Sequence, residues 1–520
     1  MSIDSSPILK AYSRFRVSQL RSQGASRESL GSTQTQQLLK LVRKARNTRF
    51  GIDHGFKYIS SVADFQKQVP LRRYEEIWDE YWKDQFPNIK NCTWPGLIKY
   101  YALSSGTSSG TTKYIPYTSE IMKATTRAGV DLLCHHVLNK PYSQILGGKS
   151  FILTGSTDLT EQAPGILGGD MSGICMKIMP AWARDRSYPP AGISGIKNWE
   201  MMIDRFAEAS LSVDIRSLNG APSWMLLFLD KLRQLRPETG GKLAKLYPNL
   251  EMVVHGGMNF EPYKKIYSDI LAGSKTETRE VYPASEGFFA VQDHGYGEGM
   301  RLIVDHGIFY EFVPLSELTS SSPTRHWISN VEPDVDYALV LSSCAGLWSY
   351  VIGDIVKFVD VTPPRLLMTG RTSYMLSAVG EHLIGEEIDK CLFAAATKIG
   401  LEIAEYSVGA IFPKTSKELI GHQYVIEFRE RIPTETDCSA LMYHLDNKLQ
   451  EINEDYQAHR RNEYGLYPPN LLVALPGAFN DWMKSRGKLG GQNKVPRVIN
   501  NQDIFQGLLA FVRSYNETTY

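Results

Sequence analysis

From residue 96 onward, short apolar runs bounded by glycine turns alternate with amphipathic helical patterns. Strands in this region are expected at 98–103, 151–153, 250–254 and 281–282, and helices at 221–235 and 260–271. Such alternation is typical of α/β proteins, in which helices cover a largely parallel sheet. The pattern therefore predicts a sandwiched, largely parallel sheet.

Further strands are expected at 300–304, 309–313, 337–341 and 347–359. The first two flank a short His306-Gly307 connection, which predicts a hairpin. Ahead of this core, residues 1–95 alternate helical patterns with polar loops, and helices with one buried stripe are predicted at 36–46 and 75–86.

A domain boundary is expected near Thr369-Gly370-Arg371, because the pattern of elements restarts there. Downstream, a helix, two strands, a long helix and a strand are expected at 386–398, 404–412, 423–429, 439–461 and 471–474. A chain of 520 residues also exceeds the size at which a single core stops growing. The predicted fold class is therefore α/β, with a large multi-sheet N-terminal domain at 1–370 and a smaller α+β C-terminal domain at 371–520.

The charge of the whole chain is balanced, with 57 basic and 56 acidic residues. This balance gives no electrostatic ground for a nucleic-acid or membrane-surface partner, and only the local placement of charge says more. The N-terminus lacks the layout of a signal peptide, and no apolar run reaches the ~20 residues of a membrane span. The six scattered cysteines are typical of reduced thiols. We therefore expect a cytoplasmic protein without nucleic-acid or membrane partners.

A phosphate-binding loop is predicted at 104–113, with the sequence Ser-Ser-Gly-Thr-Ser-Ser-Gly-Thr-Thr-Lys. Glycines let successive backbone N–H groups curl around an anion, hydroxyls add donors, and lysine adds charge. The alternative is a flexible Ser/Gly linker, although an expected strand anchors its start. The segment is not a Walker A loop, which requires the pattern GxxxxGK[ST].

Three further segments carry groups that suit nucleotide chemistry. In Tyr282-Pro-Ala-Ser-Glu286, an aromatic ring able to stack on a base lies near a carboxylate able to hold Mg²⁺. In Tyr350-Val-Ile-Gly-Asp354, an aspartate follows a strand, a usual position for accepting from ribose hydroxyls. In Gly490-Gly-Gln-Asn-Lys, a lysine lies on a glycine-rich loop. The ordinary alternatives are a solvated strand turn for the first, a plain Gly-Asp turn for the second and an exposed surface loop for the third.

In this order, SSGTSSGTTK, YPASEG, YVIGD and GQNKVPR resemble the acyl acid amido synthetases of the auxin-responsive Gretchen Hagen type, which have bacterial relatives. That family is part of the adenylate-forming superfamily, together with acyl-CoA synthetases, luciferases and peptide-synthetase adenylation domains. Each motif alone is moderately specific, and the ordered set is much more so. Residues 64–74 also look like the family's segment ahead of the phosphate loop, so the resemblance spans most of the chain.

The resemblance implies an adenylate-forming ligase fold with a binding site for ATP and Mg²⁺. Tyr282 and Ser285 would lie at the adenine and acyl pocket, and Glu286 would be a catalytic residue that binds Mg²⁺. The phosphates of ATP would be surrounded by Ser104, Ser105, Gly106, Thr107, Ser108 and Lys113.

On the same resemblance, Asp354 would take the ribose hydroxyls, with Arg371 beside it. Lys494 would be the catalytic lysine, entering from a mobile C-terminal domain. Two positions depart from the family. Val351 stands where members often have arginine, and Asn493 stands where plant members often have tyrosine, which places the chain nearer the bacterial branch.

The activity that the resemblance implies is an ATP-dependent ligation. A carboxylic acid would be activated as its acyl-AMP, with release of pyrophosphate, and the acyl group would then be joined to an amine, an amino acid on the family's pattern. Two alternatives stay open. An acyl-CoA synthetase would share the first half-reaction and form a thioester, whereas a non-catalytic module would only bind acyl groups or nucleotides.

Overall fold

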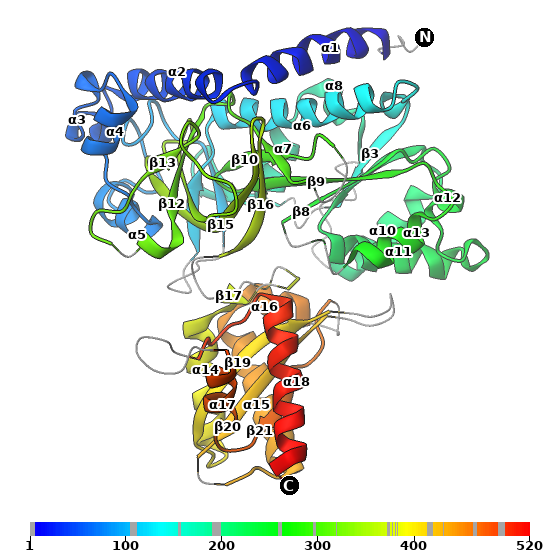
Figure 1. Ribbon diagram of the computed structural model, residues 1–520. Coiled ribbons are helices and arrows are strands. Elements are labelled where there is room, and N and C mark those ends of the chain that lie inside the picture. Colours follow the sequence, from blue (N-terminus) through cyan, green and yellow to red (C-terminus); the bar gives the residue numbers. More distant parts are fainter. Residues whose placement is uncertain are drawn as a thin grey trace. The chain divides into compact units, whose positions relative to one another are not determined.

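The computed structural model describes residues 6–104, 112–153, 158–189, 199–257, 260, 263–294, 298–318, 320–371, 375–376, 378–379, 381, 383–412, 420–429, 431–460, 465–486 and 495–519. The chain divides into two compact units. The first consists of Met1–Ser104 and Lys113–Thr372, and the second contains Ser373–Tyr520. Both units combine helices with β-sheet (Figure 1).

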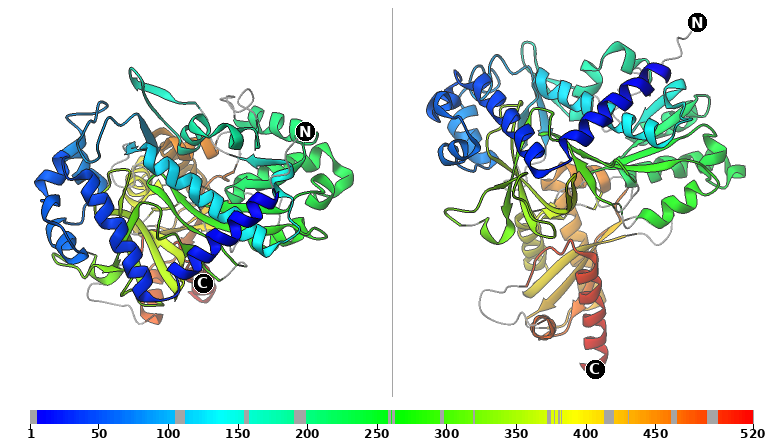
Figure 2. Two further views of the ribbon diagram at one scale, coloured as in Figure 1. Left: turned by 90° about the horizontal axis from the view of Figure 1, so that it is seen from above. Right: turned by 45° about the horizontal axis from the view of Figure 1, so that its top comes forward.

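The first unit opens with two long helices, α1 and α2, that lie along one of its faces (Figures 1 and 2). α2 begins at a capping box, in which the hydroxyl of Ser26 accepts from the N–H of Ser29 and the Ser29 side chain accepts in return. The N-terminal helices are α1 (Ser6–Gln23), α2 (Arg27–Ala45), α3 (Arg49–Asp53), η1 (Phe56–Tyr58), α4 (Val62–Gln68), α5 (Tyr74–Ile77) and the π-helical η2 (Trp78–Trp82).

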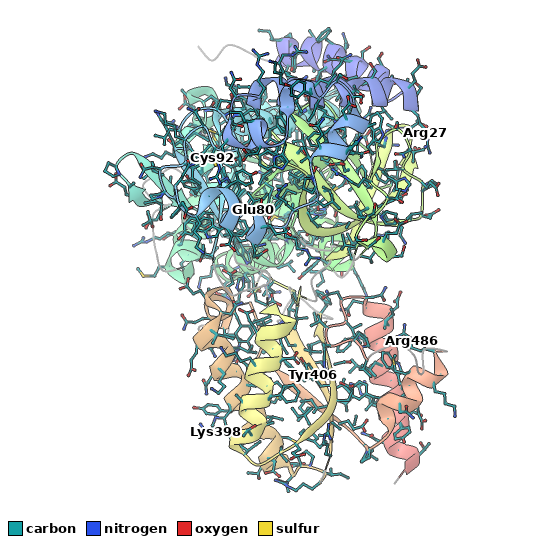
Figure 3. All side chains as sticks on the ribbon, turned by 90° about the vertical axis from the view of Figure 1, so that its left-hand side faces the viewer. Arg27, Glu80, Cys92, Lys398, Tyr406 and Arg486 are labelled. Carbon is teal, nitrogen blue, oxygen red and sulfur yellow. The ribbon has the colours of Figure 1, made fainter. Side chains whose placement is uncertain are left out.

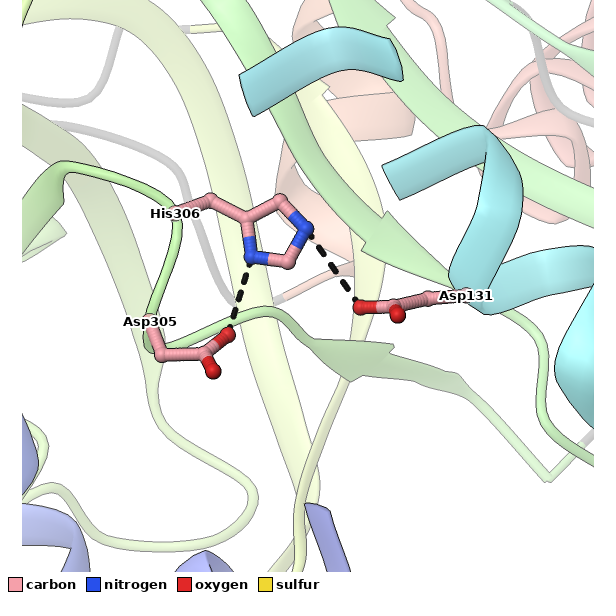
Figure 4. Close-up of side chains that lie close together, drawn as sticks. All are labelled: Asp131, Asp305 and His306. Carbon is pink, nitrogen blue, oxygen red and sulfur yellow. Dashed lines mark hydrogen bonds and ion pairs between the residues drawn. The ribbon is translucent and has the colours of Figure 1, made fainter. Parts of the chain in front are cut away.

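A buried ionic cluster ties α1 to the rest of the first unit. The guanidinium of Arg16 donates to Asp131 Oδ1 at 2.7 Å and to Asp305 Oδ2 at 2.8 Å. His306 completes the cluster, with Nδ1 2.9 Å from Asp305 and Nε2 3.4 Å from Asp131 (Figure 4). Two carboxylates and a histidine lie close enough here to hold a cation. The guanidinium groups of Arg16 and Arg127 already place positive charge beside these carboxylates.

A four-stranded sheet has the order β2-β1-β5-β4. β1 runs antiparallel to β2 and parallel to β5. β2 leads into α6 (Ser119–Asn139), whose N-cap Thr118 accepts from the N–H of Ile121 and donates to the carbonyl of Cys344. The strands are β1 (Tyr100–Ser104), β2 (Lys113–Pro116), β4 (Thr160–Ala163) and β5 (Ile166–Gly169).

A twelve-stranded mixed sheet has the order β13-β12-β14-β15-β16-β11-β10-β9-β8-β7-β3-β6. β6, β3, β7, β8 and β9 are parallel, whereas every pair from β9 to β13 is antiparallel. The expectation of a largely parallel sheet therefore holds for the strands from β6 to β9 and is wrong for the sheet as a whole. Direct turns join β9 to β10, β14 to β15 and β15 to β16, and such turns return the chain antiparallel without the crossover that parallel strands need.

The bounds of these strands are β3 (Lys149–Ile152), β6 (Ser187–Tyr188), β7 (Ile215–Gly220), β8 (Met252–Gly256), β9 (Glu277–Ala284), β10 (Gly287–Val291), β11 (Met300–Leu302), β12 (Ile308–Pro314), β13 (His326–Trp327), β14 (Asp336–Ser343), β15 (Tyr350–Val361) and β16 (Pro364–Arg371). The hairpin expected at 300–313 is wrong, because β11 pairs with β10 and β16 whereas β12 pairs with β13 and β14. The connection between them contains Asp305 and His306, which the buried ionic cluster holds. A contact with α1 therefore directs the chain where the strand pattern suggested a tight turn.

Helices cover both faces of the parallel strands. α6 packs on one face through an apolar cluster that joins Ala128 and Leu132 to Val254 and Val281. The α10–α13 group lies on the other side of β8 and β9 (Figure 1). The remaining helices of the first unit are α7 (Met171–Ile178), α8 (Ala181–Arg184), α10 (Trp199–Ser210), α11 (Pro222–Leu235), α12 (Leu243–Leu246) and α13 (Lys264–Leu271), with short 3-10 turns at η3 (Ile145–Gly147), η4 (Pro237–Thr239) and η6 (Leu315–Glu317).

The second unit is built on a three-stranded sheet of order β19-β20-β21. Val425 on β20 faces α17 and α18, where Trp482 and Phe505 bury their rings against it. The helix expected at 439–461 is broken at Asn453, which leaves helical geometry. The elements are β17 (Met375–Leu376), β18 (Leu383–Ile384), α14 (Gly385–Lys398), β19 (Ile403–Ile411), β20 (Gly421–Phe428), α15 (Glu435–Ile452), α16 (Glu454–Arg460), β21 (Asn470–Ala474), α17 (Ala478–Ser485) and α18 (Gln502–Thr519).

Candidate active site

The two ends of the predicted phosphate loop lie side by side. Ser104, at the end of β1, and Lys113, at the start of β2, are register partners in an antiparallel pair. The chain between them leaves and re-enters the sheet at one point. Ser105, Gly106, Thr107 and Ser108 lie outside the described residues.

Lys113 is buried beside two residues of α5. Its Nζ lies 4.0 Å from Glu75 Oε1 and 5.2 Å from the centre of the Tyr74 ring. The Tyr74 hydroxyl in turn accepts from the N–H of Tyr114 at 2.8 Å. A carboxylate and an aromatic face therefore hold the ammonium group at the base of the loop.

Glu286 lies in the two-residue turn between β9 and β10, next to a half-buried Ser285. Glu286 is only 7% exposed, and its Oε1 accepts from the hydroxyl of Tyr350 at 3.4 Å. Burial raises the pKa of Tyr350 well above its usual value, and the charge of Glu286 adds to this effect. Tyr350 therefore remains a protonated donor that faces a buried carboxylate.

Tyr350 also links the two ends of the candidate site. Glu75 and Tyr74, the residues that contact Lys113, lie near enough to raise the pKa of this phenol further. The base of the loop and the Glu286 turn thus share one cluster of side chains in the first unit. The sequence alone indicated no role for Tyr350. Its position as the first residue of the YVIGD motif is the signal that could have identified it.

Tyr282 and Asp354 meet across the sheet. The hydroxyl of Tyr282 on β9 donates to Oδ2 of Asp354 on β15 at 2.5 Å, and both residues are buried. These strands are four steps apart in the sheet order, which in a flat sheet would separate them by about 19 Å. The sheet must therefore curve strongly, and Figure 1 shows β15 and β16 as curved ribbons.

A bulge in β15 sets the direction of Asp354. The pairing with β14 shifts register between Ala338 and Val340, and Gly353 has φ +100°, a conformation that L side chains rarely adopt. Arg371 on β16 is the register partner of Asp354, and its side chain lies outside the described part of the chain. Lys494 also lies outside the described residues.

Val351, which stands where family members often have arginine, makes apolar contacts. It packs with Val313, Ala338 and Val340 in a small cluster. Strand alternation places it on the opposite face of β15 from Tyr350.

Glu280 is a titratable group on β9, the strand of Tyr282, and no motif in the sequence pointed to it. It lies on β9 two residues before Tyr282, and its register partner on β8 is the buried His255. Burial raises the pKa of Glu280 to about 7 and lowers that of His255 to about 3. No residue in the described ranges gives the Glu280 carboxyl a hydrogen bond or an ion pair.

Comparison with solved structures identifies the fold. The chain is similar to the GH3.15 acyl acid amido synthetase in complex with 2,4-DB, with a TM-score of 0.59 at 19% identity over 95% of each chain. It is also similar to 2-hydroxyisobutyryl-CoA ligase in complex with 2-HIB-AMP and CoA, with a TM-score of 0.56 at 13% identity over 93% of this chain and 92% of that one. The fold is that of the adenylate-forming ligases.

Three family models match most of the chain. The N-terminal, central and C-terminal domains of the GH3 family match residues 20–196, 301–371 and 386–503. The chain belongs to the GH3 family. Among the described residues, no helix has both the length and the apolar character needed to cross a membrane.

Curated relatives are indole-3-acetic acid-amido synthetases. GH3.3 of Arabidopsis thaliana is 25% identical over 51% of this chain, and GH3.8 of Oryza sativa subsp. indica is 24% identical over 58%. These matches span about half of each relative, 46% and 53% respectively. GH3.15 of Arabidopsis thaliana is 22% identical over 87% of both chains.

Proposed function

We propose that this protein is an ATP-dependent ligase that activates a carboxylic acid as its acyl-AMP, releases pyrophosphate, and joins the acyl group to an amino acid. Membership of the GH3 family across three domains is the observation that carries the proposal. The names of the relatives favour amide over thioester formation. The cluster of Lys113, Glu286 and Tyr350 supports a nucleotide site in the first unit.

Binding of ATP is assigned to three parts of the first unit. The hydroxyls and N–H groups of 104–108, together with Lys113, hold the phosphates and offset the negative charge that spreads over their oxygens during transfer. Tyr282 and Ser285 border the adenine and the acyl group. Asp354 accepts from the ribose hydroxyls, beside Arg371.

Glu286 fits the requirements of a magnesium ligand. Carboxylate oxygens are the ligands that Mg²⁺ prefers, and the Glu286 carboxylate is buried with one oxygen in a long, weak contact with the Tyr350 hydroxyl. A bound Mg²⁺ would supply positive charge to the phosphate oxygens. Tyr350 and the turn between β9 and β10 fix the direction of the carboxylate.

The smaller domain, 371–520, contributes Lys494 to the first half-reaction and then rotates away for the second. The division of the chain at Thr372–Ser373 supports a hinge in this region. The six cysteines are unpaired, which supports a location in the reducing cytoplasm.

A two-stage assay tests the proposal. Pyrophosphate release is first screened with aryl, indolyl and fatty acids, each with ATP and Mg²⁺. Active acids are then incubated with amino acids or with coenzyme A, and the product is identified by mass. An acyl-amino acid is the expected product. A thioester product would mean that the protein is an acyl-CoA synthetase instead. Absence of pyrophosphate release with every acid would favour a non-catalytic binding module.

A further inference from the structure

The helices α1 and α2 form a basic face on a chain whose total charge is balanced. The two helices contain a single acidic residue, Glu28. Their exposed or half-exposed cations include Lys10, Arg14, Arg21, Arg27, Lys40 and Arg43. Both helices lie along one face of the first unit (Figures 1 and 2), so their charges gather on that face.

Most of these cations have no carboxylate partner among the described residues. Arg16 forms ion pairs within the buried cluster, and Lys44 pairs with Glu120. Within the described part of the chain, no carboxylate pairs with Lys10, Arg14, Arg21, Lys40 or Arg43. Ion pairs do form elsewhere on the surface of this unit, as between Arg72 and the exposed Glu80, which is labelled in Figure 3.

Large apolar side chains accompany the charges on α1. Ile8, Tyr12 and Phe15 are 69%, 42% and 68% exposed. Their spacing of four and three residues places them on one side of the helix. At about 100° per residue, Lys10, Arg14 and Arg21 fall on the other flank of the exposed side of α1, so an apolar row and a basic row border that side. Exposed apolar groups and exposed cations are the two components by which a helix binds a membrane interface.

Loose attachment of α1 does not explain this exposure. The opposite side of the helix is buried through Val17 and Leu20. The Arg16 guanidinium also binds Asp131 and Asp305 from beneath. α1 is therefore fixed to the first unit, and its apolar side chains point outward as part of the folded structure.

We propose that the outward face of α1, extended by α2, docks reversibly on an anionic membrane surface. Ile8, Tyr12 and Phe15 enter the boundary between headgroups and acyl chains, and the cations on the other flank of α1 and on α2 pair with anionic lipid headgroups. A nucleic acid would use the same cations but would leave these aliphatic and aromatic groups without a hydrophobic partner. The chemistry of the face therefore favours lipid.

Sedimentation of the full chain with vesicles tests the proposal. Vesicles of phosphatidylcholine with about one third phosphatidylserine are compared with phosphatidylcholine alone, at low salt and at roughly 0.5 M salt. Binding to the anionic vesicles is expected, with a strong loss at high salt. Arg14→Gln/Arg21→Gln should weaken that binding about tenfold or more, since each cation near the surface contributes about fivefold. Phe15→Ser should weaken it several-fold at both salt concentrations.

Two matched controls test whether the loss of any exposed cation or aromatic side chain, and not only of those on α1, weakens binding to the vesicles. Lys245→Gln/Lys265→Gln removes two exposed cations from α12 and α13, and Tyr142→Ser removes an aromatic that is 96% exposed. Both should bind like the parent, and all variants should keep its melting temperature and pyrophosphate release. Equal binding to neutral vesicles, no binding by the parent, equal losses in the controls, or preference for duplex DNA over anionic vesicles would each overturn the proposal.

Discussion

The hydroxyl of Tyr282 donates to Asp354 at 2.5 Å from a strand four positions away in the sheet. A short bond of this kind orients the acceptor, so we expect Tyr282 to position the aspartate that we propose for the ribose. Tyr282→Phe removes the donor and keeps the ring. Hydrogen bonds to charged groups contribute about 1.5–3 kcal/mol, so KM for ATP should rise at least tenfold. KM for the acid should stay unchanged in pyrophosphate-release assays.

Tyr337→Phe is the matched control for that prediction. Tyr337 is also a buried tyrosine, and its hydroxyl accepts from the N–H of Glu332, outside the candidate site. This variant should lose stability without a change in KM for ATP. Equal effects of the two variants on KM would show that Tyr282 acts only through folding.

Glu280 makes stability depend on pH. Its pKa rises from 4.5 to about 7 in the folded protein, because burial disfavours the charged form. Between these two pKa values the folded state holds a proton on Glu280 that the unfolded state has released. The free energy of unfolding therefore falls as pH rises from about 4.5 to about 7. Glu280→Gln should raise the free energy of unfolding by about 1–3 kcal/mol at pH 8 and leave it almost unchanged at pH 4.5. Urea titrations at both pH values measure this difference.

The control for Glu280→Gln is Glu238→Gln, at a carboxylate that is 64% exposed. It should change stability by less than about 0.5 kcal/mol at either pH. A parent protein whose stability does not fall between pH 4.5 and pH 8 relative to Glu280→Gln would contradict the raised pKa.

A single strand, β15, carries several parts of the candidate site. Tyr350 faces the buried Glu286, Val351 faces an apolar cluster on the other side, and the bulge at Gly353 redirects Asp354. One strand therefore contributes both the donor beside the proposed magnesium ligand and the proposed ribose acceptor.

The attachment of α1 includes one buried cation, Arg16, beside the buried side chains of Val17 and Leu20. Burial alone would disfavour ionised carboxylates, yet His306 and Arg16 hold the pKa of Asp305 far below its usual range. Arg16→Ala leaves Asp131 and Asp305 buried without this partner. Removing one member of a buried ionic cluster costs about 3–5 kcal/mol, which should appear as a lower midpoint in urea unfolding of the first unit.

Arg14→Ala is the control, since Arg14 is an exposed residue on the same helix. It should shift the midpoint little, because surface substitutions usually change stability by less than about 0.5 kcal/mol. Similar midpoints for the two variants would mean that the ionic cluster adds nothing to the attachment of α1.

In the proposed reaction of the whole chain, the smaller domain contributes a catalytic residue to the first step and not to the second. Lys494 is assigned to adenylation only. Lys494→Ala should therefore reduce acyl-AMP formation at least a hundredfold, as loss of a charge that stabilises a transition state does, while aminolysis of a supplied acyl-AMP continues. Single-turnover assays of the two half-reactions measure this. Equal loss of both steps would contradict the assignment.

The elements that sequence predicted well are those with strong local patterns. The helix expected at 221–235 is α11 (Pro222–Leu235), and the strand expected at 404–412 is β19 (Ile403–Ile411). Hydrophobic periodicity and capping residues act over a few positions, so the sequence encodes them directly. The ordered motifs likewise pointed to the GH3 family, to which the chain belongs.

Contacts between residues that are distant in the sequence depend on how the elements pack. Tyr282 and Asp354 are 72 positions apart, and Arg16 and Asp305 are 289 apart. The Tyr282–Asp354 contact depends on curvature of the sheet. The Arg16–Asp305 contact explains why β11 and β12 do not form the expected hairpin. The order of residues along the chain specifies which side chains are available and in which local elements they lie. Packing of the curved sheet brings particular side chains together. The folded arrangement is the one that leaves the least buried unpaired charge and the least exposed apolar surface over the whole unit.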